Sequence, residues 1–418
     1  MNDADRRQFE ASVREELEGR LMPFWLERSV DDVHGGFIGW MSNTGRIDAL
    51  APKGLILNAR LLWTFSALCK RYPTERCGVL AQRAYDYLTT RFWDADRGGA
   101  FWQVDARGAV LDDTKKIYGQ AFMIYALAQY AQIQPDAEAL PLARSLFERL
   151  EHDARDARYG GYFEVCQRDW TVIEQSRLSS KDLAAPKSMN NHLHLLEAYT
   201  TLYRVWPETQ VADALRELIR IFQELIIDAN AHQRHFFDEQ WHPLSTAYTY
   251  GHDIEASWLL CEAADVLGDA DLCLQVRELA LLLARHALNE GIDASGGLCY
   301  AGDHHRITNN NKEWWPQAEC VVGFLNAYQR NREASFEKAA RAAWDFIQRS
   351  IVDRQHGEWF WRVDAQGRPD RGEPKVSMWK GPYHNVRACL EILQRLRSLN
   401  GEHLGSANAL QDASSAAL

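Results

Sequence analysis

The chain has 418 residues, 46% of them hydrophobic, which is enough for one large core or two ordinary domains. Its 47 basic and 58 acidic residues give a net charge of −11, which argues against nucleic acid or an anionic membrane as the main partner. The N-terminus is polar, and no apolar run reaches the roughly 18 residues that a membrane span needs. We therefore expect a soluble cytoplasmic protein, a monomer or alternatively a dimer.

The eight cysteines are scattered, and none forms a C-x-x-C pair. Most lie in apolar helical runs such as Trp258–Cys261. This distribution is typical of small buried side chains in a reducing compartment and predicts neither disulfides nor a cysteine metal site.

A short motif of glycine and aromatic residues recurs along the chain. Its copies are HGGFIGW at 34–40, RGGAFWQVD at 97–105, YGGYFEV at 159–165, a degenerate RHFFDEQW at 234–241, SGGLCYAGD at 295–303 and HGEWFWRVD at 356–364. The copies are centred on positions 36, 99, 161, 235, 297 and 358, which lie 63, 62, 74, 62 and 61 residues apart. The spacing predicts six units of about 60 residues, with the polar stretch Arg177–Lys187 as an inserted loop in the long interval.

Apolar residues at three-to-four spacing flank every copy and predict two helices per unit. The predicted helices cover 6–27, 55–71, 77–92, 118–132, 138–152, 189–206, 210–228, 252–267, 270–288, 314–331, 334–351 and 382–398. Gly-Gly permits positive φ and aromatic residues favour β pairing, so turns or short hairpins should join the paired helices.

This pattern predicts an all-α fold, an (α/α)6 barrel of twelve helices with short β-hairpins between helix pairs. We expect one catalytic domain over residues 1–400. The alternative is an open α-solenoid, which needs polar capping repeats that are not obvious at either end. The tail 401–418 is rich in Ala, Ser, Asn and Gly and is predicted to be disordered.

Polar and aromatic side chains occur near the start of every even-numbered predicted helix. In chain order they are Arg60, Tyr118, Asn190, His194, His252, Glu255, Trp315, Glu319, Trp379 and His384. The inner helices of a closed barrel run parallel, so their N-termini meet at one mouth. Six units would then direct these groups into one funnel, which predicts an enzyme rather than a scaffold.

Helical spacing places several of these residues on shared faces. Asn190 and His194 are four residues apart, and His252 and Glu255 are three apart. His192 lies two residues from His194, so the two rings should diverge and not form a metal pair. Helix N-termini disfavour a protonated histidine, which suits a neutral imidazole acting as a base.

Other interpretations remain open at this level. A histidine near a helix start is often a capping or packing residue, and Trp314 and Trp315 could belong to the core. His252, Glu255 and Glu319 could bind a metal, although the chain has no strong ligand motif. Alternatively, Glu319 could be the general acid of a glycosidase, paired with Glu255.

Six segments together resemble the N-acylglucosamine 2-epimerase superfamily, and within it the cellobiose 2-epimerases. They are LNARLLWTFS, YGQAFMIYAL, KSMNNHLHLLEAYTTLYRVWP, YGHDIEASWLL, EWWPQAECVVGFLNAYQ and MWKGPYHNVRACLEI. The resemblance implies an (α/α)6 barrel. It also implies an isomerase without metal or other cofactor that interconverts glucose and mannose units at the reducing end of β-1,4-linked disaccharides.

The resemblance also implies roles for individual residues. His252 and His384 resemble the acid/base pair, His194 the histidine that assists ring opening, and Arg60 the residue bound to O1 and O2 of the sugar. Glu255 and Glu319 resemble the supporting carboxylates. The remaining positions resemble sugar-contacting residues: Tyr118, Asn190, Trp315, Trp379 and Asp182.

One departure concerns Gly381, which stands where cellobiose 2-epimerases often carry Cys. Mannose 2-epimerases and aldose–ketose isomerases share much of the pattern, so an enzyme specific for monosaccharides is the alternative. A glycoside hydrolase or a carbohydrate-binding protein without turnover are the candidates from other classes.

Overall fold

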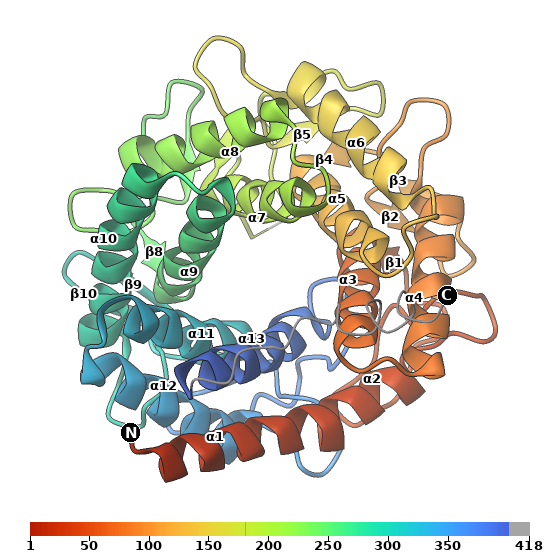
Figure 1. Cartoon of the computed structure of the whole chain (residues 1–418). Helices are drawn as coiled ribbons and strands as arrows, with labels where there is room; N and C mark the ends of the chain where they lie inside the picture. The colour runs from red at the N-terminus through yellow and green to blue at the C-terminus, as the bar shows by residue number, and fades with distance from the viewer. Residues whose placement is uncertain (180, 401–418) are drawn as a thin grey trace, which may run out of the picture.

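The computed structural model describes residues 1–179 and 181–400, which form two concentric rings of helices (Figure 1). The inner ring contains α3 (Leu55–Arg71), α5 (Ile117–Ala131), α7 (Met189–Val205), α9 (Tyr250–Leu267), α11 (Trp314–Asn331) and α13 (Tyr383–Leu399). The outer ring contains α1 (Asp3–Glu16) with α2 (Met22–Arg28), α4 (Glu75–Tyr87), α6 (Ala139–Arg149), α8 (Thr209–Ile221), α10 (Ala270–His286) and α12 (Ala334–Phe346). The predicted barrel of twelve helices is confirmed, since α1 and α2 are parts of one helix.

Every outer helix contains or ends in a five-residue π turn. These turns are η1 (Leu17–Leu21), η2 (Leu88–Phe92), η3 (Leu150–Ala154), η4 (Phe222–Ile226), η5 (Ala287–Gly291) and η6 (Ile347–Ile351). The wider turn bonds residue i to residue i+5, as in the bond from the Trp93 amide to the Leu88 carbonyl (2.9 Å). The first turn lies between α1 and α2, where the sequence predicts one uninterrupted helix.

The two rings differ in how their helices are buried. Outer helix α8 buries one apolar stripe, which includes Val211, Leu215 and Leu218. Inner helix α5 is buried on almost every side, because it packs against α3, α7 and α6. The core is therefore a closed layer between the two rings of helices.

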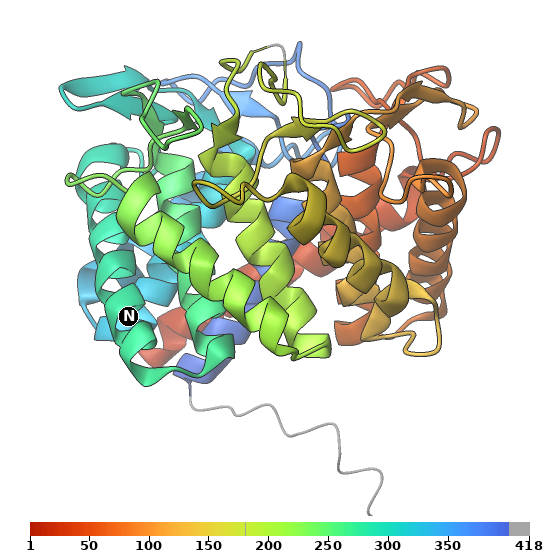
Figure 2. The same cartoon turned by 90° about the horizontal axis from the view of Figure 1, so that it is seen from above.

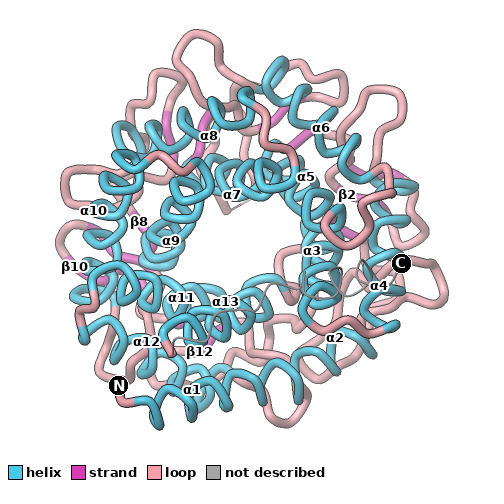
Figure 3. The backbone as a smooth tube through the Cα atoms, viewed as in Figure 1, coloured by secondary structure: helices cyan, strands magenta, loops and turns pink. Residues whose placement is uncertain are grey.

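Short strands and loops gather at one end of the barrel, seen at the top of Figure 2 and in magenta in Figure 3. The strand before an inner helix pairs with the strand after the glycine motif of the next unit. These antiparallel pairs are β1 (Lys53–Gly54) with β2 (Gln103–Val104), β4 (Lys115–Lys116) with β5 (Val165–Cys166), β6 (Lys187–Ser188) with β7 (Phe236–Phe237), β8 (Tyr248–Thr249) with β9 (Ala301–Asp303), and β11 (Lys312–Glu313) with β12 (Arg362–Val363).

Most of the β pairing therefore joins neighbouring units and is not a hairpin inside one unit. Among the named strands of the described chain, only two pairs have no helix between their strands and form local hairpins. They are β2 with β3 (Val110–Asp112) and β9 with β10 (Arg306–Asn309). Sequence spacing shows where a strand lies but not its partner, and here the ring geometry sets the partner.

The glycine motifs form the predicted turns, each closed by a β bridge such as that between Trp93 and Ala100. Gly99 has φ +71°, and a Cβ at this position would lie 2.6 Å from the Trp170 ring. The fourth turn lies at a different place from the one predicted, because the bridge joins Ile227 and Gln233. His232, and not residue 235, occupies the position that a glycine holds before the bridge in other units. The prediction was wrong because the two phenylalanines of β7 resemble the aromatic part of the motif.

Five units share an ion pair between the aspartate after the outer helix and the lysine before the inner helix, and in four of them both side chains are buried. The pairs are Asp31–Lys53 (2.7 Å), Asp94–Lys115 (3.0 Å), Asp156–Lys187 (2.7 Å), Asp293–Lys312 (2.5 Å) and Asp353–Lys375 (2.7 Å). They fix the strand end of each unit. The fourth unit has Asp228 but carries Tyr248 at the lysine position.

The ring closes between the last inner helix and the first units. Helix α13 packs against α3 and α1, and Met41 forms a bridge with Val376. All eight cysteines lie among the described residues and are free. Within 1–179 and 181–400, every helix is too short or too polar to cross a membrane. The predicted disordered tail, 401–418, lies outside the described residues.

Candidate active site

The N-terminal ends of the inner helices enclose a cavity of about 430 Å³ at the strand end of the barrel. It is lined by ten of the eleven residues selected from the sequence. They are Arg60, Tyr118, Asp182, Asn190, His194, His252, Glu255, Trp315, Trp379 and His384. The eleventh, Glu319, is fully buried behind His384.

His384 lies in the first turn of α13, and its Nδ1 is 2.7 Å from Oε1 of Glu319. Burial, with the nearby charges of Arg60 and His252, lowers the pKa of His384 well below its usual value. The uncharged form of the ring is therefore favoured. If Nδ1–H donates to Glu319, Nε2 keeps its lone pair and can act as a base.

His252 lies in the first turn of α9, where its Nδ1 is 2.5 Å from the hydroxyl of Thr249. Burial lowers the pKa of His252 well below its usual value, and the neighbouring His235 adds to this effect. The ring centroid of Trp315 is 4.7 Å from that of His252 and 5.6 Å from that of His384. The two neutral imidazoles thus flank one indole at the wall of the cavity.

His194 is fixed by a carboxylate on its own helix. Its Nδ1 lies 2.9 Å from Oε2 of Glu197, one turn further along α7. Burial and the charge of Arg60 lower the pKa of His194 well below its usual value. His192, two residues earlier, points elsewhere and accepts a hydrogen bond from the Tyr162 amide (2.9 Å), so it fixes the glycine turn.

Arg387 is a central residue that the sequence analysis missed. Its Nη2 donates to Glu255 (2.9 Å) and Glu319 (2.7 Å), and its Nη1 donates to Glu197. Burial raises the pKa of Glu255 to about 8 and lowers that of Arg387 to about 10. One buried guanidinium therefore links the carboxylates that support His384 and His194.

The spacing rule used elsewhere could have found this network. Glu197 is three residues after His194, and Arg387 is three residues after His384. Tyr383, which donates to Glu197, lies one turn before Arg387.

Arg60 extends from α3 across the cavity floor. Its Nη1 donates to the Trp379 carbonyl (3.1 Å) and its Nη2 to the Tyr118 hydroxyl (2.9 Å). The guanidinium lies 4.5 Å from the Phe122 ring centroid, which restricts its orientation. Two nitrogens are thus held in a plane beside the cavity, as the binding of two adjacent sugar oxygens requires.

The outer part of the cavity is more open. Trp315, Trp379 and Asn190 are partly exposed there, whereas Trp314 is buried. The predicted inserted loop contains no helix in its described residues, 177–179 and 181–187. It brings Asp182 to the rim, where a side-chain oxygen accepts from the Ser179 amide (2.8 Å). This rim could accept a second sugar ring.

A metal site at this cavity is disfavoured by the charge arrangement. Glu255, Glu319 and His384 each place one potential ligand atom within 4.8 Å of the others. However, Arg387 already donates to both carboxylates, and its positive charge would repel a divalent cation at this position. His252, a member of the metal set considered from the sequence, is bonded instead to Thr249.

Residues 36–388 match the model of the N-acylglucosamine 2-epimerase family. The chain belongs to this family. The chain is similar to the cellobiose 2-epimerase of Bacteroides fragilis, with 41% identity over 91% of this chain and 97% of that protein. The cellobiose 2-epimerase of Ruminococcus albus is 37% identical over 92% of this chain and 98% of that protein.

Solved structures of family members agree with the fold. The cellobiose 2-epimerase of Spirochaeta thermophila superimposes with a TM-score of 0.87 at 40% identity, covering 95% of this chain and 98% of that chain. A D-mannose isomerase superimposes with a TM-score of 0.82 at 21% identity, covering 92% and 97% of the two chains, which supports the fold alone.

Proposed function

We propose that the protein is a disaccharide 2-epimerase that inverts C2 of the reducing-end glucose or mannose unit of β-1,4-linked disaccharides such as cellobiose and lactose. The observation that carries the proposal is the pair of neutral imidazoles, His252 and His384, beside one cavity with Arg60. The identity of 41% to a cellobiose 2-epimerase over most of both chains supports the choice of substrate.

The reaction begins with ring opening, because a C2 hydrogen is acidic only beside a free aldehyde. In the proposed mechanism, His194 assists the proton transfers at O1 and O5. Its carboxylate partner, Glu197, orients the ring for this task. The open sugar then presents C2 to the two remaining histidines.

One of His252 and His384, in its neutral form, removes the C2 proton, and the electron pair moves into an enediolate with negative charge on O1. Arg60 stabilises this charge inside the buried cavity. For inversion, the other histidine must already be an imidazolium when the open sugar binds, so the reactive form of the site holds one proton shared between His252 and His384. The imidazolium gives this proton to the opposite face of C2, and the first histidine keeps the abstracted proton for the reverse reaction. A lowered pKa makes the imidazolium a stronger acid, although it also makes the singly protonated form less populated.

The carboxylates do not suit inverting glycoside hydrolysis. Inverting hydrolases hold two carboxyl groups about 6.5–9.5 Å apart. Here an oxygen of Glu255 and one of Glu319 lie within 4.8 Å of each other. Glu319 is also fully buried and accepts hydrogen bonds from Trp258 (3.0 Å) and Arg387 (2.7 Å), so it is not available as an acid or nucleophile.

We expect cellobiose and lactose to be turned over more efficiently than glucose or mannose. The partly exposed Trp379 at the rim can stack on a second ring, and such stacking contributes on the order of 1 kcal/mol, or about fivefold in kcat/KM. NMR of product mixtures from each sugar in D₂O measures the rates and the entry of deuterium at C2. Faster turnover of free mannose, or formation of a ketose, would instead support a monosaccharide epimerase or isomerase.

Metal removal should leave the epimerisation rate unchanged, because Arg60, which lines the cavity, supplies the positive charge that a Lewis acid would otherwise provide. The measurement is the initial rate with cellobiose before and after exhaustive dialysis against EDTA. A rate that disappears and returns with Zn²⁺ or Mn²⁺ would make Glu255, Glu319 and His384 metal ligands instead.

A further inference from the structure

A second pocket, of about 410 Å³, lies in the fourth unit and is rich in histidine. Four of the 14 histidines of the chain line it: His232, His286, His304 and His305. The pocket lies outside the proposed catalytic cavity, and its lining shares no residue with that cavity.

The fourth unit departs from the repeat at this place. Tyr248 replaces the lysine, and its ring stacks on His232 with centroids 3.6 Å apart and planes 4° apart. His232 in turn stands where other units have a glycine. In the sixth unit the same position holds Glu358, which forms an ion pair with Lys380 (2.8 Å). Glu358 shows that a side chain at this position need have no role beyond fixing the turn.

His232 does more than this structural role requires. Its Nδ1 lies 2.8 Å from Asp253, which fixes the turn to α9 in the same way as Asn385 of α13 holds Glu358 in the sixth unit (2.7 Å). The opposite ring nitrogen, Nε2, points away from α9 and lies 3.3 Å from Oε2 of Glu290. With Nδ1–H donating to Asp253, a metal ion that displaces the proton from Nε2 would find the Nε2 lone pair directed at Glu290.

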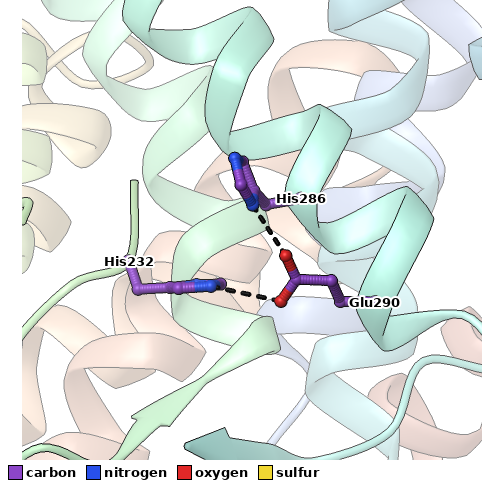
Figure 4. A group of neighbouring side chains, drawn as sticks. All are labelled: His232, His286 and Glu290. Atoms are coloured by element: carbon purple, nitrogen blue, oxygen red, sulfur yellow. Dashed lines mark hydrogen bonds and ion pairs between the residues drawn. The ribbon is translucent and has the colours of Figure 1, made fainter. Parts of the chain in front are cut away.

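Two further ligand groups come from the end of the next outer helix. His286 ends α10, and Glu290 lies four residues later in η5, so both side chains point the same way (Figure 4). Nδ1 of His286 is 2.8 Å from Oε1 of Glu290, and the carboxylate lies between the two imidazoles. One ligand atom from each of the three residues lies within 4.8 Å of the others.

We propose that His232, His286 and Glu290 form a binding site for a divalent transition-metal ion such as Zn²⁺. Two imidazoles and one carboxylate are ligands that Zn²⁺ takes, with a fourth position left for water. Zn–N bonds of about 2.0–2.1 Å place neighbouring ligands about 3.4 Å apart, so the three groups must move together slightly. His286 and Glu290 allow this movement because their side chains are 29% and 39% exposed.

The surrounding charge favours a cation. Asp253 and Glu290 both face His232, and Asp228 lies nearby with Arg234 as its partner (2.7 Å). Asp253, fully buried, orients the His232 ring in the manner of a carboxylate–histidine–metal triad. The ion would join the turn of the fourth unit to the end of α10. In the other five units a lysine instead joins this turn to the segment before the inner helix.

The test is titration of EDTA-treated full-length protein with Zn²⁺. Calorimetry measures Kd and stoichiometry, and thermal unfolding measures the change in Tm. We expect one site whose Kd rises by more than about 10-fold in His286→Ala and in Glu290→Gln. His242→Ala is the matched control, since His242 forms the same i,i+4 pair with Asp238 (2.9 Å) at an exposed place. This control should bind Zn²⁺ and rise in Tm as the natural chain does.

Equal Zn²⁺ affinity and stoichiometry in the natural chain and in both His286→Ala and Glu290→Gln would overturn the site. Zn²⁺ bound by the histidines of the catalytic cavity would remain bound in these variants and would be displaced by cellobiose. These two properties distinguish it from Zn²⁺ bound at the His232 site. The absorption of bound Co²⁺ gives a second readout, because loss of a histidine ligand changes the spectrum. None of these measurements depends on epimerase activity.

Discussion

Replacing His384 or His252 with alanine is expected to lower the epimerisation rate by about 10²–10⁴-fold while the chain stays folded. In the proposed mechanism each ring supplies the nitrogen that removes or returns the C2 proton, and alanine provides no replacement. Both side chains line the cavity, so the loss leaves a space that water can fill. The initial rate with cellobiose, measured beside the circular dichroism spectrum, checks the expectation.

His242→Ala serves as the control for a histidine outside the cavity, and its rate should equal that of the natural chain. The two active-site variants should also differ in D₂O. Each lacks one of the two bases, so exchange at C2 of one epimer can continue without inversion. A folded variant of either residue with near-normal inversion would remove that histidine from the mechanism.

Arg60→Lys is expected to reduce kcat by about 10²–10³-fold, the loss usual for a donor to a developing oxyanion. Lysine keeps the charge but cannot donate at the same time to the Trp379 carbonyl and the Tyr118 hydroxyl, which together hold the guanidinium plane. The measurement is kcat and KM with cellobiose. The fall should appear mainly in kcat, since the lost interaction is strongest in the transition state.

Arg83→Lys is the matched control for this substitution. Arg83 also donates to two oxygens, the carbonyls of Gly36 (2.9 Å) and Asp31 (2.7 Å), but it lies outside the catalytic cavity. Its replacement should lower the unfolding temperature and spare kcat. If Arg60→Lys retains most of its activity, Arg60 has only a diffuse electrostatic or structural role.

The periodic part of the fold could be predicted from the sequence because each unit repeats one pattern. The predicted helix over 55–71 matches α3, and that over 314–331 matches α11. The π turns could not be predicted this way, since one extra residue in a turn changes the apolar spacing very little. Strand partners depend on the closed ring, and no local pattern encodes them.

Some residues of the candidate site could likewise be predicted from the sequence, and others could not. Residues at the start of each inner helix were predicted because parallel helices bring one end together. Arg387 and Glu197 were missed because a charged residue in a helix is usually solvated, and only tertiary packing shows that these two are buried together. The pocket around His232 was missed for a different reason: its ligands come from two units, and the fourth glycine motif was placed three residues too late.

The position of α13 in the chain has a consequence for biosynthesis. This helix is the last one in the described sequence, and it supplies both His384 and Arg387. It also fills the gap between α11 and α3, which the chain leaves open until then. The ribosome therefore releases five of the six inner helices before any catalytic centre can exist. A nascent chain that lacks α13 has no carboxylate network centred on Arg387. Under the proposed mechanism, proton transfer at C2 can therefore begin only after the ring has closed.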